Sequence, residues 1–332
     1  MAACHRVFAF ACLVSAALLP PGSYARERDL SVYDISTDAT AQLPAYVDVA
    51  RRRHATAIKR IAIVSFTVEF IDSRAPGAAS PPKGDEQKAQ PVIAGIAITL
   101  DLAQLRPIAD TLYDLAAEDL RGAGVEVLTA DEVSALPGYA TLKAALIATP
   151  YRLDGSDEQG RRTSVVVSAH GLPAYRATGR SPSAASETEI AKRGNVAVLH
   201  AHLVVDFLTL RDSDGRLFRS KLVPRYVEMV RAVETRYRIV ASDASITTAE
   251  LRKAVRAPES PVALSRLGDP TTEDHSDEAD EDASSDSKDS PGESARAVIE
   301  RITINPAVYY DQALRYLGAA QDMLLGALAA SP

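Results

Sequence analysis

Apolar residues follow strand-like patterns at three places in the first half of the chain. KRIAIVSFTVEFI (residues 59–71) begins with a continuous apolar run and then alternates polar and apolar residues. This pattern predicts a long strand that is buried along its first half. VIAGIAITL (92–100) predicts a second strand that pairs with the first, and VEVL (125–128) predicts a short third one.

Helical spacing of apolar residues occurs before and after the short third strand. In residues 104–124 the apolar positions recur three and four residues apart, Pro107 suits a first turn, and two glycines suit the C-terminal end. Thr129 stands three residues before Glu132, which is the spacing of a capping box at the start of a helix. A Pro-Gly pair interrupts this helix before the pattern resumes. The order strand, helix, strand, helix favours a βαβ unit with a right-handed crossover.

Strands dominate the predicted second half. Residues 161–173 and 196–210 predict two strands on either side of a short helix in SETEIAKRGN (186–195). RDSDGR then predicts a hairpin turn into LFRSKLV (217–223), because Asp-Gly between alternating apolar runs is a strong hairpin signal. The pattern of residues 224–240 is ambiguous, since it fits a third meander strand and also lines one side of a helix.

The C-terminal part of the chain predicts helices. TTAE (247–250) has the spacing of another capping box and predicts a short helix. After ITI (302–304), Asn305 and Pro306 introduce a long amphipathic helix that is long enough to cover the sheet. We interpret the aromatic residues of this helix as cover for a core, with a partner surface as the alternative; they are Tyr309, Tyr310 and Tyr316.

The first residues resemble a secretory leader. Arg6 precedes an apolar run of about 13 residues, which is shorter than the roughly 20 that cross a bilayer. A small-x-small site ends at Ala25, so we expect cleavage there and export of a soluble protein. A lipoprotein anchored through Cys12 is the alternative. Both cysteines, Cys4 and Cys12, lie in this leader, so the mature chain has no thiol, and we expect a periplasmic location in a bacterium.

The acidic character of the chain comes from one tract. Residues 269–293 hold 11 acids and one Lys, a net charge of −10, and almost no apolar residue. Such a segment cannot bury enough surface to fold. Removing Arg6 with the leader changes the net charge from −7 to −8, so the rest of the mature chain carries about +2. We therefore expect no nucleic-acid partner.

These boundaries predict the following organisation. The segments are a signal peptide (1–25), an N-terminal extension (26–58), an α/β domain (59–268) with a mobile loop (73–91), an acidic disordered insertion (269–296), and a C-terminal helix that packs on the α/β domain (297–332). The predicted fold class is α/β, with a mixed sheet flanked by helices, a hairpin or meander in the second half, and a C-terminal amphipathic helix.

The order of elements from RIAIVSF through PIADTLYDLAAEDLRGAG and VEVL to VAVLHAHLVV resembles a group of exported α/β domains. These are typified by the curli-secretion lipoprotein, the penicillin-binding-protein activator lipoprotein and the amino-terminal domain of the Tol-system propeller protein. The resemblance covers roughly residues 59–225 and implies a mixed sheet with helices on both faces and a role in binding envelope components. It transfers no functional residue, and the acidic insertion and the last helix depart from it.

The sharpest chemical pattern is LHAHLVVDFLTL (199–210). Because side chains alternate along a strand, one face is predicted to be core, and it holds Leu199, Ala201, Leu203, Val205 and Phe207. The other face is predicted to be less buried, and it holds His200, His202, Val204, Asp206 and Leu208. Two imidazoles about 7 Å apart on one face can converge on zinc, with His170 as the third ligand. The favoured interpretation is that the histidines mark the less buried face.

The sequence contains no GxSxG, HExxH or Walker motif, and GAGVEV lacks the third glycine of a dinucleotide fingerprint. The main hypothesis is therefore a non-enzymatic accessory protein of the cell envelope that binds other envelope proteins, without a cofactor and without an integral membrane span in the mature chain. A homo-oligomer stays open. One alternative is a metal-dependent hydrolase that uses His200, His202 and His170. The other is a carrier that holds a small hydrophobic or lipid ligand between the sheet and the last helix.

Overall fold

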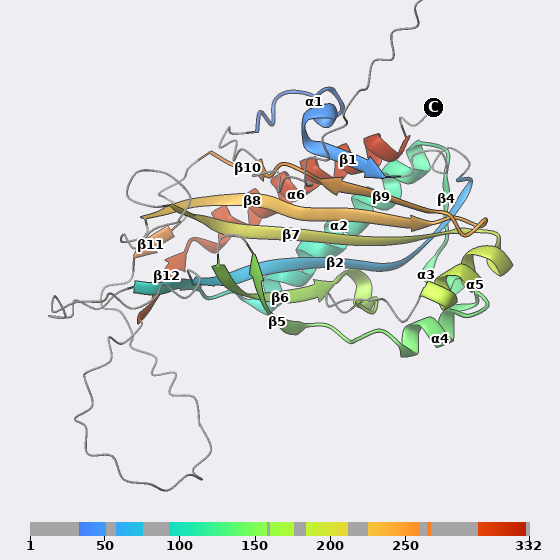
Figure 1. The fold of residues 1–332 in the computed structure, drawn as a ribbon, viewed down its shortest axis with the longest axis horizontal. Coiled ribbons are helices and arrows are strands. Elements are labelled where there is room, and N and C mark those ends of the chain that lie inside the picture. The colour runs from blue at the N-terminus through green and yellow to red at the C-terminus, as the bar shows by residue number, and fades with distance from the viewer. Residues whose placement is uncertain are drawn as a thin grey trace, which may run out of the picture. The chain divides into compact units, whose positions relative to one another are not determined.

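A twelve-stranded mixed sheet is the centre of the structure (Figure 1). The computed structural model describes residues 33–50, 58–75, 93–157, 160–175, 184–211, 225–258, 264–266 and 298–329. The strands are β1 (Val47–Ala50), β2 (Arg60–Ala75), β3 (Ile93–Ile98), β4 (Glu126–Val127), β5 (Tyr151–Asp157), β6 (Gly160–Ser168), β7 (Ala197–Arg211), β8 (Arg225–Val240), β9 (Ile246–Leu251), β10 (Val255–Arg256), β11 (Leu264–Arg266) and β12 (Val298–Ile304). The predicted α/β class with a mixed sheet and a C-terminal helix is confirmed.

Helices lie on both faces of this sheet. They are α1 (Ala39–Tyr46), α2 (Leu102–Gly122), α3 (Ala130–Ser134), α4 (Tyr139–Ala144), α5 (Ala184–Gly194) and α6 (Pro306–Ala329). In Figure 1, α2 and α6 cross behind the long strands, and α3, α4 and α5 gather at the right-hand end. No helix within the described ranges has both the length and the apolar character that crossing a membrane requires.

Strand β2 organises the sheet because it has different partners along its length. Its first part pairs in parallel with β7 and β4, and β4 follows α2 along the chain, which agrees with the predicted βαβ unit. From Ser73 onward β2 pairs with β3, on the side that β7 occupied up to Phe70. The β6–β5 hairpin extends the sheet from the opposite edge of β2. The sheet is therefore split where β7 and β2 part.

The alternation of side chains on the central strands supplies two separate cores. Ile61, Ile63 and Leu199 point to one face and pack in the large cluster formed with α2 and α6. Their neighbours Ala62 and Val198 point to the other face and pack in a smaller cluster with α3, α4 and α5. Since the small cluster covers only the start of β2 and β7, the rest of that face is left to polar side chains.

Two helix predictions need correction. Helix α2 begins at Leu102, two residues before the predicted start at Gln104, because Asp101 caps it and accepts a hydrogen bond from the Ala103 amide. Pro107 therefore lies inside the helix rather than in its first turn. The short helix predicted from TTAE is wrong: these residues belong to β9, which lies between β8 and β1. The ambiguous segment 224–240 is strand β8.

Several local predictions are confirmed. Thr129 and Glu132 form the reciprocal capping box of α3. The predicted core residues of β7 are all buried; they are Leu199, Ala201, Leu203, Val205 and Phe207. The opposite face differs from the prediction, since Val204, Asp206 and Leu208 are buried as well. The predicted aromatic cover is partly confirmed, because Tyr309 and Tyr316 are buried.

Some predicted segments have another structure or lie outside the described residues. Residues 39–50, taken as part of an extension, form α1 and β1, and β1 pairs with β9. Residues 73–75, placed in a loop by the sequence, end strand β2. The remainder of that loop, the strand 217–223 and the acidic insertion lie outside the described residues, as does the signal peptide.

Candidate functional site

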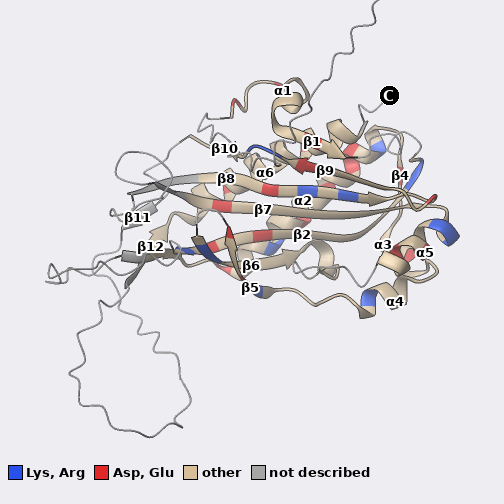
Figure 2. Cartoon of the chain, in the orientation of Figure 1, with Lys and Arg blue, Asp and Glu red and all other residues tan. Residues whose placement is uncertain are grey.

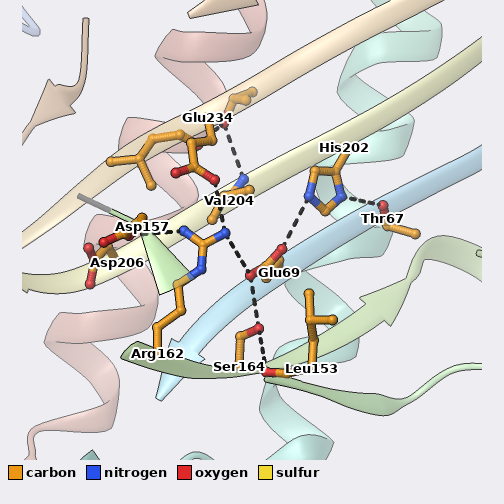
Figure 3. A network of polar contacts seen from close by, with 12 residues as sticks. Thr67, Glu69, Leu153, Asp157, Arg162, Ser164, His202, Val204, Asp206 and Glu234 are labelled. Carbon is orange, nitrogen blue, oxygen red and sulfur yellow. Dashed lines mark hydrogen bonds and ion pairs between the residues drawn. The ribbon is translucent and has the colours of Figure 1, made fainter. Parts of the chain in front are cut away.

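Charged side chains follow the face of the sheet that α3, α4 and α5 leave uncovered. Figure 2 shows acidic and basic positions along β2, β7 and β8. His202 of β7 lies at the centre of one group: its Nδ1 is 3.0 Å from Thr67 Oγ1, and its Nε2 is 3.2 Å from Glu69 Oε2 (Figure 3). Burial raises the pKa of Glu69, but His202, Arg162 and a hydrogen bond from Ser164 together outweigh it and lower the pKa.

The order hydroxyl, imidazole, carboxylate in this group is that of a hydrolase triad. Thr67, however, is only 4% exposed, and its hydroxyl is 3.3 Å from the carbonyl oxygen of Ala201 on the neighbouring strand. A substrate carbonyl has no access to such a hydroxyl. We therefore interpret Thr67, His202 and Glu69 as cross-strand contacts that satisfy buried polar atoms.

Arg162 of β6 continues the group toward the split in the sheet. It contacts Glu69 at 3.6 Å, Asp157 at 3.2 Å and Glu234 at 2.9 Å (Figure 3). Burial lowers the pKa of Arg162, but Glu234 and the other two carboxylates reverse this effect and raise it. Through this guanidinium β6 is joined to three further strands, β2, β5 and β8.

Asp206 fills the split between β7 and β2. It is fully buried, and Arg74 Nη2 lies 2.7 Å from its Oδ2, while Arg231 also contacts that oxygen. Arg74 is 1% exposed and binds Asp157 with two hydrogen bonds of 3.0 and 2.8 Å. Burial raises the pKa of Asp206, but Arg231 and Arg74 hold it well below its usual value.

His200 lies one step along β7 from His202 and has a separate partner. Its Nε2 is 3.1 Å from Glu187 of α5, without the alignment of a hydrogen bond, and Glu187 also contacts Arg238 at 2.6 Å. Burial lowers the pKa of His200, although the nearby carboxylate of Glu187 acts in the opposite direction. The pKa of Glu187 is lowered to about 2, because His200 and Arg238 outweigh the effect of burial.

The third histidine of the predicted metal site lies elsewhere. His170 is in the short turn Ala169–Gly171 and packs against α2, where its amide is 2.6 Å from Asp110 and its Nε2 is 2.9 Å from Asp114. The structure thus gives each of His170, His200 and His202 its own carboxylate. Across the described ranges no group of three or more His, Cys, Asp or Glu side chains is arranged to hold a metal ion. The metal-dependent hydrolase stays a prediction without geometric support.

A cavity of about 480 Å³ lies on the opposite face, between the last helix and the sheet. The sheet contributes Ile61, Leu199 and Ile239, and α6 contributes Leu325 and Leu328. The ends of α1 and α2 complete the lining, with residues that include Ala39, Leu120 and Ala123. This volume falls within the roughly 300–1,000 Å³ of cavities that hold small ligands.

Three aspartates interrupt the apolar lining, and among the described residues that line the cavity there is no Lys, Arg or His. Asp38 caps α1, where its carboxylate accepts a hydrogen bond from the Thr40 amide. Asp119 and Asp322 have no such role. Burial raises the pKa of Asp119, and burial and the charge of Asp119 together raise the pKa of Asp322 to about 6. Tyr33 and Tyr237 also lie near Asp322. The pKa of each tyrosine is raised, mainly by its own burial and secondly by the negative charge of Asp322.

Sequence reasoning did not find these two aspartates. Asp119 lies in a helix that carries several other acids, which hides it. Asp322 left a clearer signal, because it is the only charged residue among residues 316–332. A single acid in an apolar helical segment is expensive to bury and so indicates a special environment.

Comparison of the chain with family models, curated proteins and solved structures finds no match. The function therefore has to be inferred from the geometry of these sites. Most of the charged groups on β2, β7 and β8 are paired with one another or with Glu187 of α5. The cavity, by contrast, offers space for a ligand and carboxylates without a partner among the described residues.

Proposed function

We propose that the protein is a non-enzymatic binding protein of the cell envelope that holds a small apolar ligand between its last helix and its sheet. The cavity of about 480 Å³ carries this proposal, because its walls come from α1, α2, α6 and three sheet strands and are mainly apolar. The envelope location is supported by the leader-like residues 1–25 and by the absence of cysteine from the rest of the chain.

The position of the cavity explains how binding would be coupled to the fold. Helix α6 packs against β8, α1 and α2, and its residues Asp322, Leu325 and Leu328 form one wall. Gly326 faces α1 so closely that an added Cβ would lie 3.4 Å from Leu43 and from Thr40. A ligand in the cavity would therefore contact the helices and the sheet together and stabilise their packing.

The test is binding of an apolar probe by the purified mature protein. We expect decyl maltoside, kept below its micelle concentration, to bind with a 1:1 stoichiometry in isothermal titration calorimetry and to raise the melting temperature. Ala123→Leu places a larger side chain in the cavity from an exposed position at the end of α2 and should weaken binding at least about tenfold. Glu118→Gln, on the same helix but outside the lining, should leave it unchanged.

Absence of saturable binding to the wild-type protein would reject the cavity as a ligand site. Equal binding by wild type and Ala123→Leu would do the same, provided that both proteins melt cooperatively. Native mass spectrometry of protein released gently from the envelope adds an independent measurement, since a carrier is expected to retain part of its natural ligand.

Binding of another envelope protein, the main hypothesis from the sequence, is the second candidate function. The observation that favours it is strand β5, which pairs only with β6 among the described strands and leaves its outer edge open to an extended segment of a partner. A photo-crosslinking residue at Ser156 should then capture a protein in intact cells, whereas one at Glu118 should not. Equal labelling at both positions would count against this edge.

A further inference from the structure

We propose that the ligand of the cavity between α6 and the sheet carries a positively charged group, which binds to Asp119 and Asp322 while its apolar part enters the cavity. This inference rests on the proposed function and adds the chemical class of the ligand, a cationic amphiphile. It excludes anionic lipids and fatty acids as preferred ligands.

The first argument is the charge of the lining. Asp119 lies in the last turn of α2 and Asp322 in the last part of α6, so two elements far apart in the sequence bring carboxylates to one cavity. Asp38 adds a third carboxylate at the start of α1. Since the part of the lining that the structure describes holds these carboxylates and no cationic side chain, its charge attracts cations and repels anions.

The second argument is the contrast with the other acids of the protein. Glu69, Glu187 and Asp206 each contact an Arg or His side chain. Asp119 and Asp322 make no side-chain hydrogen bond or ion pair within the described part of the chain, although they share the cavity lining with apolar residues. The fold thus supplies a counter-charge for these three buried carboxylates, whereas the solvent-accessible Asp119 and Asp322 at the cavity stay available.

The third argument concerns the energy of the empty site. Two carboxylates that repel each other next to an apolar wall hold their charge poorly, as the raised pKa of Asp322 indicates. A bound ammonium or guanidinium group would remove this repulsion, and its apolar part would displace water from the wall. Both effects favour the same ligand, one with a cationic head and a hydrocarbon tail.

The experiment compares three probes with the same tail: decyltrimethylammonium, decyl maltoside and decyl sulfate, all below their micelle concentrations at pH 7.5. We expect the cation to bind about tenfold more tightly than the neutral probe, and the anion to bind more weakly than both. Asp322→Asn and Asp119→Asn should each remove most of the advantage of the cation and leave the neutral probe unaffected. Glu118→Gln and Asp311→Asn are the matched controls, because each removes one acid from the same helix outside the cavity.

The outcomes separate this inference from the proposed function. If the neutral and cationic probes bind equally well, the cavity is a ligand site and the charge preference is wrong. If none of the three binds, the proposed function fails first. If the control substitutions weaken binding of the cationic probe as much as Asp322→Asn does, the preference comes from the general charge of the surface and the inference is overturned. Of the three probes, only the cationic one should bind less tightly to the wild-type protein when the salt concentration is raised.

Discussion

Asp206 offers the strongest test of how the fold is held together at the split in its sheet. The carboxylate is fully buried and is shared by Arg74 and Arg231, which are 1% and 3% exposed. Asp206→Asn keeps the shape of the side chain and removes its charge. Two buried guanidiniums would then face each other across a neutral amide, so we expect a large loss of unfolding free energy.

The magnitude follows from the contacts that remain. Removing one partner of a buried ion pair costs about 3–5 kcal/mol. Arg74 retains its two hydrogen bonds to Asp157, which places the expected loss near the lower end, at about 3 kcal/mol. A domain with a total stability of about 5–15 kcal/mol would lose a large fraction of it.

Urea denaturation at pH 7, followed by circular dichroism, measures this loss. The matched control is Glu234→Gln, which removes the charge from a pair with Arg162 at 2.9 Å in which the acid is 51% exposed. Exposed pairs contribute less than about 1 kcal/mol. If Asp206→Asn costs no more than this control, the buried charges are not what holds β7 and β2 together, and the reasoning is refuted.

Two further predictions concern pH. The pKa of Glu187 is about 2 in the folded protein, below its ordinary value of 4.5, so the stability it contributes is present above pH 4.5 and is lost as the pH falls toward 2; Glu187→Gln should flatten this part of the stability–pH curve measured by urea denaturation. The pKa of Asp322 is raised from 3.8 to about 6, so the folded state binds this proton more tightly and loses stability as the pH rises through 6. Asp322→Asn should therefore be more stable than wild type at pH 7.5, by about 1 kcal/mol because solvent reaches the group and reduces the full effect, and the two should be equal at about pH 3, below the unfolded pKa.

The sequence predicted elements whose signals are local. Residues 59–71 and 196–210 have the continuous apolar and β-branched character of central strands, and they form β2 and β7. The capping residues Thr129 and Glu132 are close in sequence, and the box they form needs no other part of the chain. Such signals can be found without knowing the tertiary structure.

The failures arise where distant pairing decides the structure. Residues 247–250 satisfy the spacing of a capping box, but their alternating burial between β8 and β1 makes them a strand, and tertiary contacts override the local preference. Arg74 was placed in a loop because Pro, Gly and Ser follow it closely. Its buried contact with Asp206, 132 residues away, depends on the split in the sheet, which no local pattern announces.

The histidine pattern shows the same limit in the candidate chemistry. The period of two correctly placed His200 and His202 on one face, opposite the core residues of β7. It could not show that Glu187 of α5 would pair with His200 and that Glu69 of β2 would pair with His202. Pairing with separate carboxylates changes two potential metal ligands into parts of an ion-pair network.

Asp322 connects the stability of the protein with its proposed activity, and this connection gives a joint test. A carboxylate that destabilises the empty protein at neutral pH has a cost that a binding site can explain, because functional groups are often placed where they reduce stability. Asp322→Asn should then make the empty protein more stable and bind the cationic probe less well. The cation at 100 times its dissociation constant should stabilise the wild-type protein by about 2.7 kcal/mol, and at that same concentration it should stabilise the variant less. A variant that gains stability without losing affinity would show that Asp322 is only a strained surface acid, whereas the opposite changes in one protein would establish its role in binding.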